Sequence, residues 1–241
     1  LIFMLFYLWK KKLFSISLAA FERKWILPLC GKGLPAAFQQ SIPAISTSFL
    51  TSLVSGFGIS AIAAYGVAGK LEILLFYPAM ALNMVLTAIV GQCAGGGRLD
   101  RVKDYLKLSL LYGGVCLAVL SFLVVCFAQS LCRLFVDSTE VNRIVQTYFQ
   151  IIGVGYVLNT VTNCFLGAVN GLGKPGKSLF CMVLYYLIVR MPLAWILMIL
   201  GFGLNGIWAA VLLSHVVATA AACLVGRKEM IPSPRKACVC R

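Results

Sequence analysis

LSLLYGGVCLAVLSFLVVCFAQ, residues 108–129, is a stretch of 22 residues that contains no Asp, Glu, Lys or Arg. An α-helix rises about 1.5 Å per residue, so this stretch would form a helix about 33 Å long. The hydrocarbon core of a bilayer is about 30 Å thick. Residues 108–129 therefore predict a helix that crosses a membrane.

The composition of the whole chain favours the same environment. Of 241 residues, 61% are apolar and 12% are charged, and the mean hydropathy is +0.95. Soluble domains carry about 45–50% apolar and about 25% charged residues. The chain has too little polar surface to cover soluble domains of this length. We interpret it as a polytopic integral membrane protein, and this interpretation excludes a soluble enzyme.

Similar apolar runs recur along the chain and predict an all-α transmembrane bundle. Six of them are long enough to cross a bilayer: Leu34–Phe57, Ala61–Gln92, Leu108–Gln129, Tyr148–Val169, Leu179–Leu200 and Gly206–Val225.

The rest of the chain divides around these runs. Residues 1–9 are apolar but too short to span, and Lys10, Lys11 and Lys12 follow at once. We interpret residues 1–9 as the end of a preceding transmembrane helix whose beginning is missing. Residues 10–33 are predicted to be a cytoplasmic connection, residues 34–228 a six-helix transmembrane lobe and residues 229–241 a cytoplasmic tail.

The positive charges follow the predicted topology. The net charge is +14, and 17 of the 21 Lys and Arg residues fall in the connections on one side of the six spans. Cytoplasmic loops of membrane proteins are rich in Lys and Arg. The excess of positive charge therefore predicts a cytoplasmic C-terminus. It indicates membrane topology and not nucleic-acid binding.

GLGKPGKS, residues 171–178, fits the phosphate-binding pattern G-x-x-x-x-G-K-[ST]. That loop functions between a strand and a helix in a parallel sheet. A predicted membrane helix precedes the motif, and no later acid suits a magnesium ion. The glycines and the proline are typical of a tight turn. We predict a cytoplasmic turn that binds no nucleotide.

Arg190 is the most unusual polar residue within a predicted span. It lies 12 residues after Ser178, about 18 Å along the helix and near mid-membrane. Pro192 is expected to bend this helix and to free nearby carbonyl groups. Two interpretations stay open: Arg190 faces a cavity and positions an acid or a polar substrate group, or it caps the freed carbonyls.

Other polar residues mark candidate pathway positions. Lys70 and Glu72 begin the second span, and a solvated pair near the outer surface is favoured. The first span carries a serine stripe, for which helix packing is favoured over cavity lining. An inward polar patch is predicted in the fourth span. The pathway candidates are Gln39, Gln40, Ser48, Ser52, Asn159, Asn163 and Arg190.

Catalysis and metal binding receive little support. The ten cysteines form no pattern with zinc-ligand spacing. His215 is the single histidine, and a packed side chain is favoured over a ligand or a proton relay. The chain contains neither HExxH nor GxSxG. We expect no enzyme activity, no metal and no cofactor.

The motifs together resemble the second, C-terminal half of a bacterial multidrug and toxic compound extrusion (MATE) transporter. GLPAAFQQ (33–40), KLE (70–72), GQCAGGGR (91–98) and RMPLA (190–194) carry the resemblance in this order. The structural positions within these motifs are Lys70, Glu72, Gly91, Gln92 and Pro192.

The resemblance implies one six-helix lobe of a twelve-helix transporter whose two lobes surround a central cavity. It also implies export of amphiphilic, often cationic, drugs and toxic compounds in exchange for H⁺ or Na⁺ across the bacterial plasma membrane. The partners would be small-molecule substrates, the coupling ion, the lipid bilayer and the missing N-terminal half. Some relatives have a glutamate where this chain has Pro43, so their coupling acid is expected to be absent here.

Two alternatives stay open at this point. One is a membrane scaffold, or a remnant without transport activity. The other is a relative of lipid-linked sugar flippases, which would show several charged residues along a hydrophilic cavity. Arg190 is the sole charge that the sequence places near mid-membrane.

Overall fold

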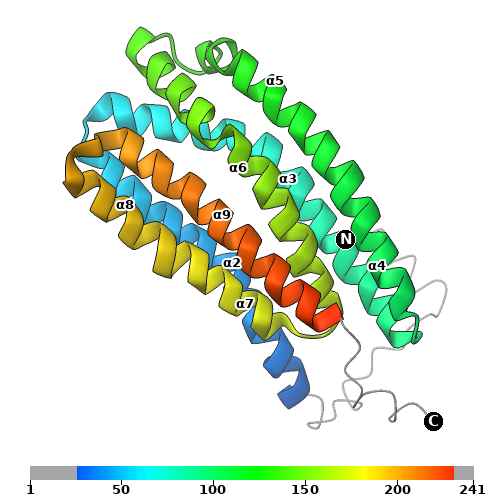
Figure 1. Cartoon of the computed structure of the whole chain (residues 1–241). Helices are drawn as coiled ribbons and strands as arrows, with labels where there is room; N and C mark the ends of the chain where they lie inside the picture. Colours follow the sequence, from blue (N-terminus) through cyan, green and yellow to red (C-terminus); the bar gives the residue numbers. More distant parts are fainter. Residues whose placement is uncertain (1–25, 231–241) are drawn as a thin grey trace, which may run out of the picture.

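The computed structural model describes residues 26–230, and within this range it contains helices and no strand (Figure 1). The all-α prediction is confirmed for this part of the chain. The helices, in chain order, are α2 (Ile26–Ser55), α3 (Ile59–Gly95), α4 (Leu99–Leu108), η3 (Ser109–Gly113), α5 (Gly114–Arg133), α6 (Thr139–Gly171), α7 (Pro175–Val183), η4 (Leu184–Arg190), α8 (Met191–Leu197), η5 (Met198–Phe202) and α9 (Gly203–Met230).

The described helices join into six rods, one for each predicted span. α4, η3 and α5 form one continuous rod, and α7, η4, α8 and η5 form another. By length and hydropathy, four uninterrupted helical segments qualify as membrane spans, and the longest, Pro175–Met230, includes two rods. The chain reverses between those two rods at Gly201 and Gly203, whose φ angles of 89° and 57° favour glycine.

The rods are longer than the apolar runs that predicted them. α2 begins at Ile26, eight residues before Leu34, and α6 begins at Thr139, nine residues before Tyr148. Hydropathy marks only the apolar part of a helix, so polar turns at its ends escape detection. Residues 1–9 and most of the tail lie outside the described residues.

α6 is the central helix of the bundle, and it packs against α3, α5 and α9. Its contact with α3 depends on glycines. A Cβ atom on Gly167 would lie 2.6 Å from the carbonyl oxygen of Asn83, and one on Gly171 would lie 2.7 Å from Cβ of Val90. Small residues let two membrane helices approach closely. Because these two positions have no side chains, α3 can lie directly against α6.

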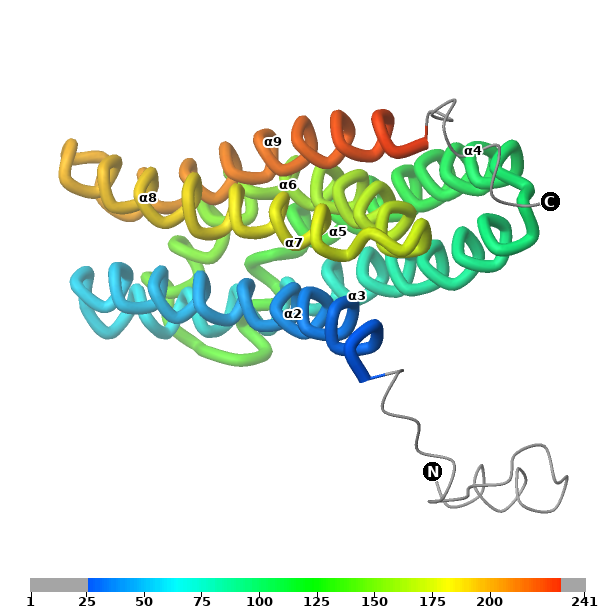
Figure 2. The backbone as a smooth tube through the Cα atoms, turned by 90° about the horizontal axis from the view of Figure 1, so that it is seen from below, coloured from blue at the N-terminus to red at the C-terminus, as the bar shows by residue number. Residues whose placement is uncertain are grey.

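α2 and α3 have different main packing neighbours in the bundle. α2 packs mainly along α7 (Figure 2), with further contacts to α3, η4 and α8, whereas the main contact of α3 is with α6. Gly58, with φ 97°, lies in the short turn that joins α2 to α3. The two consecutive helices therefore belong to different sides of the bundle, and the space between the sides contains the candidate site.

The segment with the phosphate-binding pattern is a turn between helices. α6 ends at Gly171, Gly173 has φ 74°, and α7 begins at Pro175. Lys174 and Lys177 both form ion pairs with Glu229 near the end of α9. The motif thus follows a helix instead of a strand, and its two lysines are occupied by a carboxylate.

Candidate functional site

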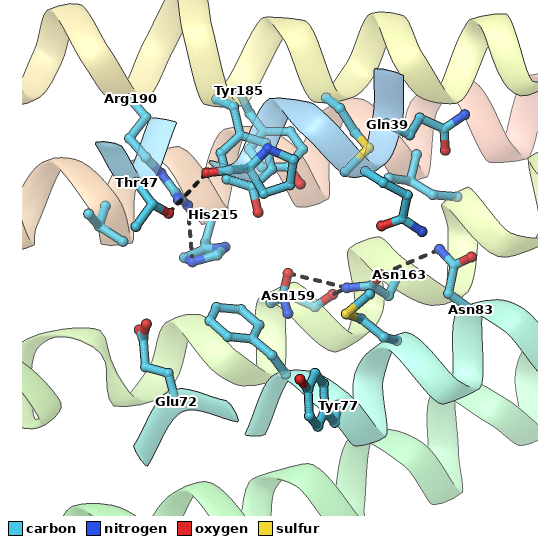
Figure 3. Close-up of a pocket in the computed structure, with 18 of the residues that line it drawn as sticks. Gln39, Thr47, Glu72, Tyr77, Asn83, Asn159, Asn163, Tyr185, Arg190 and His215 are labelled. Atoms are coloured by element: carbon cyan, nitrogen blue, oxygen red, sulfur yellow. Dashed lines mark hydrogen bonds between the residues drawn. The ribbon is translucent and has the colours of Figure 1, made fainter. Parts of the chain in front are cut away.

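A cavity of about 480 Å³ opens between α2, α7, η4 and α9 on one side and α3 and α6 on the other (Figure 3). Its wall mixes aromatic rings and methionines with a few polar side chains. The polar residues that line it are Gln39, Gln40, Thr47, Glu72, Asn83, Asn159, Asn163, Asn170, Arg190 and His215.

Glu72 lies in this cavity, on the α3 side (Figure 3). Its Oε1 atom accepts hydrogen bonds from Tyr148 Oη at 2.5 Å and Tyr156 Oη at 2.7 Å, both on α6. Lys70 is exposed. The predicted solvated pair of Lys70 and Glu72 is therefore wrong, because residues two apart on a helix project in different directions.

Arg190 lies across the cavity from Glu72 (Figure 3). Its side chain is 6% exposed. Nε donates to Ser214 Oγ at 2.8 Å, Nη2 lies 3.2 Å from His215 Nε2, and the guanidinium carbon is 4.5 Å from the centre of the Tyr186 ring. Among the described residues its hydrogen bonds go to the side chains of Ser214 and His215 and not to backbone carbonyls, and the residue lines the cavity.

The local backbone explains how Arg190 reaches this position. It is the last residue of the π-helical segment η4, and Pro192 follows two residues later at the start of α8. Proline removes a backbone donor and interrupts the regular helical bonds. π-helical turns inside helices recur at functional sites. The distortion predicted at Pro192 is thus a π-helical segment, η4, that comes before this proline in the chain.

A row of amides runs along the cavity away from Arg190. Asn83 Nδ2 donates to Asn163 Oδ1 at 3.4 Å, and Asn163 Nδ2 donates to the Asn159 carbonyl oxygen at 3.0 Å. Further along, Asn170 Nδ2 donates to Gln39 Oε1 at 3.1 Å. The predicted pair Asn159 and Asn163 is therefore joined by the Asn83 amide from α3, and the Gln39 amide from α2 bonds to Asn170 further along α6.

The other predicted pathway positions fall into two groups, those that line the cavity and those that do not. Gln40 lines the cavity, but Ser48 and Ser52 are exposed on another face of α2. Ser46 and Thr47 take the inward positions instead: Ser46 is fully buried and Thr47 lines the cavity. The serine spacing correctly predicted that these residues share one face of α2. It did not predict that this face is exposed. The structural positions Gly91, Gln92 and Pro192 do not line the cavity.

Several site residues were not singled out by sequence. Tyr148 and Tyr156 are eight residues apart and so share a helix face, but tyrosines are frequent in membrane helices and give no distinct signal. His215 was expected to be packed, and it is 1% exposed while also lining the cavity. Within residues 26–230, no three His, Cys, Asp or Glu side chains lie close enough to hold a metal ion.

Comparison with known proteins identifies the family. The MatE family model matches residues 35–196, which is about two thirds of the chain. The chain is 28% identical over 160 residues to the FAD transporter of Shewanella oneidensis, covering 66% of this chain and 35% of that protein. It is 25% identical over 195 residues to a probable multidrug resistance protein NorM of Pasteurella multocida, covering 79% of this chain and 42% of that protein.

Solved structures show the same fold. The Vibrio cholerae MATE transporter VcmN in its bent form aligns with a TM-score of 0.82 at 21% identity, covering 93% of this chain and 51% of that one. A MATE protein in the straight conformation aligns with a TM-score of 0.86 at 19% identity, covering 95% and 53%. The chain spans about half the length of these relatives or less. It belongs to the MatE family, whose members are membrane transporters, and it corresponds to a half of a MATE transporter.

Proposed function

We propose that this chain forms one lobe of an exporter of amphiphilic, often cationic, compounds, and that the exporter works by antiport with H⁺ or Na⁺. The lobe acts together with an N-terminal half in the bacterial plasma membrane, with the C-terminus in the cytoplasm. The observation that carries the proposal is the cavity of about 480 Å³ with Glu72 in its wall.

The cavity has the mixed character that an amphiphile needs. Binding sites for small molecules are mostly apolar, with a few polar groups that fix orientation. Here rings and flexible thioethers make up the apolar part, and methionine side chains adapt to ligands of different shape. The apolar lining includes Tyr65, Phe76, Tyr77, Met80, Met84, Met182, Tyr185 and Tyr186.

Glu72 supplies the group that couples an ion to a substrate. Its Oε1 atom is held by Tyr148 and Tyr156, whereas Oε2 has no hydrogen-bond partner among the described residues. A carboxyl group at membrane depth is costly and marks an ion or substrate pathway. One carboxylate balances one positive charge at a time. A proton, a sodium ion and a cationic substrate therefore compete for Glu72, which is the requirement for antiport.

The requirement for a second lobe follows from the mechanism of access. A transporter exposes its site to each side of the membrane in turn, largely because one bundle rocks against the other. The flippase alternative expects several charges along the cavity, and here the charged lining residues are Glu72 and Arg190. A scaffold would have no use for a carboxyl group in an open cavity.

Drug accumulation in a pump-deficient host tests the proposal. Expressed alone, the 241 residues should insert in the membrane without lowering accumulation of a cationic rhodamine methyl ester. Co-expressed or fused with the upstream half, they should lower it, and collapse of the ion gradient should abolish the effect. Gradient-dependent export by the 241 residues alone would contradict the two-lobe mechanism, and no export in either arrangement would contradict the transporter proposal.

A further inference from the structure

The cavity wall around Arg190 has a feature that ion exchange at Glu72 does not use. The guanidinium group is held from three directions by Ser214, His215 and Tyr186, so its position is fixed. Among the described residues, the ion pairs are those of Lys174 and Lys177 with Glu229, and none involves Arg190. A buried guanidinium group without a paired carboxylate is costly.

The contact between Arg190 and His215 determines the histidine tautomer. A guanidinium group has only donors, so Nε2 of His215 must accept from Nη2 at 3.2 Å. The ring proton is then on Nδ1. Within residues 26–230, Nδ1 of His215 has no hydrogen-bond partner although it is buried. An orphaned buried donor therefore lies beside a buried, unpaired cation.

The neighbouring groups do not supply the missing acceptor. Figure 3 shows His215 between Arg190 and the Asn159 side of the cavity, with Glu72 on the opposite wall. Asn159 Oδ1 accepts from Asn163, and Glu72 accepts from the two tyrosines. A buried donor without an acceptor is costly. Because the two ring nitrogens of an imidazole point in nearly opposite directions, this donor faces away from Arg190, and the guanidinium group still lacks an anionic partner. An anionic group of a ligand in the cavity would supply that partner.

We propose that Arg190, which Ser214 and His215 hold in place, forms an anion subsite for a carboxylate or phosphate group of the transported compound. The inference rests on the proposed transport function and specifies its substrate class. The compound is a zwitterionic amphiphile, with its anionic group at Arg190, its positive group toward Glu72, and its apolar body against the aromatic lining between them.

Binding of two matched dyes to the purified full-length transporter tests the subsite. The free acid of a rhodamine carries a carboxylate, and its methyl ester has the same ring system without that charge. A charge-assisted hydrogen bond is roughly twice as strong as a neutral one, so the wild type should bind the free acid about tenfold more tightly. Fluorescence anisotropy gives both affinities on the same sample.

Substitutions locate the preference within the cavity. Arg190→Gln should remove the preference for the free acid over the ester, because the lost interaction is specific to the anionic group. Arg190→Lys should keep part of the preference, since it keeps the charge but not the forked donors. Arg143→Gln, which removes an exposed arginine on α6 outside the cavity lining, is the matched control and should change nothing.

Each result has a defined meaning. Ester binding by Arg190→Gln shows that this variant is folded. If Arg190→Gln does not fold, His215→Phe, which removes the acceptor that orients the Arg190 guanidinium group, should reduce the preference several-fold. Equal affinity of the wild type for both dyes, or a preference that survives in Arg190→Gln or in His215→Phe, overturns the subsite while leaving ester transport intact. Absence of binding by either dye overturns the subsite and the transport function together.

Discussion

Under the proposed function, Glu72 combines two tasks in one carboxyl group. Tyr148 and Tyr156 donate to the same oxygen atom and so hold the side chain against α6. The second oxygen has no partner among the described residues and remains for a proton or a cation. Glu72→Gln keeps an oxygen that accepts from the tyrosines, but it removes the exchangeable charge. The two tasks are therefore separable by a single substitution.

The direction of the Arg190 side chain is predictable from the sequence, whereas that of Glu72 is not. The reason is physical. The rise per residue of a helix gives the depth of Arg190, and at that depth an arginine is expelled from lipid toward the protein interior. Glu72 was expected near the outer surface, where lipid does not force a direction. Its position is set by tyrosines 76 and 84 residues away in the chain, and no local pattern reveals such partners.

At the scale of helices, the close contact of α3 with α6 carries a prediction. Gly167→Leu should separate the two helices, because its Cβ atom alone would lie 2.6 Å from the Asn83 carbonyl oxygen. Overpacking of this kind costs about 1–3 kcal/mol. Thermal unfolding of the purified protein in detergent should show a lowered midpoint for Gly167→Leu.

The matched control is Gly66→Leu, on α3. Gly66 is exposed, and a Cβ atom there has no neighbour within 4 Å. Its midpoint should equal that of the wild type. Equal midpoints for Gly66→Leu and Gly167→Leu would mean that the glycine at position 167 does not determine the packing of α3 on α6.

The helices themselves were predictable because each apolar run is long and uninterrupted. Their ends were not, since α4 is amphipathic and adds polar turns to the apolar run at 108–129. The turns at Gly173 and Gly201 were predictable from glycine and proline. The cavity was not, because it depends on α2 lying along α7 while α3 lies along α6, and hydropathy carries no information on which helices are neighbours.

For the whole molecule, the charge distribution predicts the orientation. The α8–α9 turn lies at the end of the bundle opposite to α4 and to the α6–α7 turn (Figure 1). The lysine-rich α6–α7 turn is expected in the cytoplasm. In a cysteine-free background, Phe202→Cys should react with a membrane-impermeant maleimide on intact cells, and Leu99→Cys should not. Both positions are exposed, at 63% and 42%, so the reverse pattern would invert the orientation.

The central claim is that the Glu72 cavity couples an ion gradient to export, and dye efflux from proteoliposomes tests it most directly. The full-length transporter should drive efflux of the rhodamine methyl ester under an imposed H⁺ or Na⁺ gradient. Glu72→Gln should lose at least about tenfold of the gradient-driven rate, since removing an interaction that carries a full charge costs about 1.5–3 kcal/mol. Glu140→Gln, at an exposed glutamate near the start of α6, should retain the wild-type rate. Gradient-driven efflux by Glu72→Gln at the wild-type rate would contradict the account.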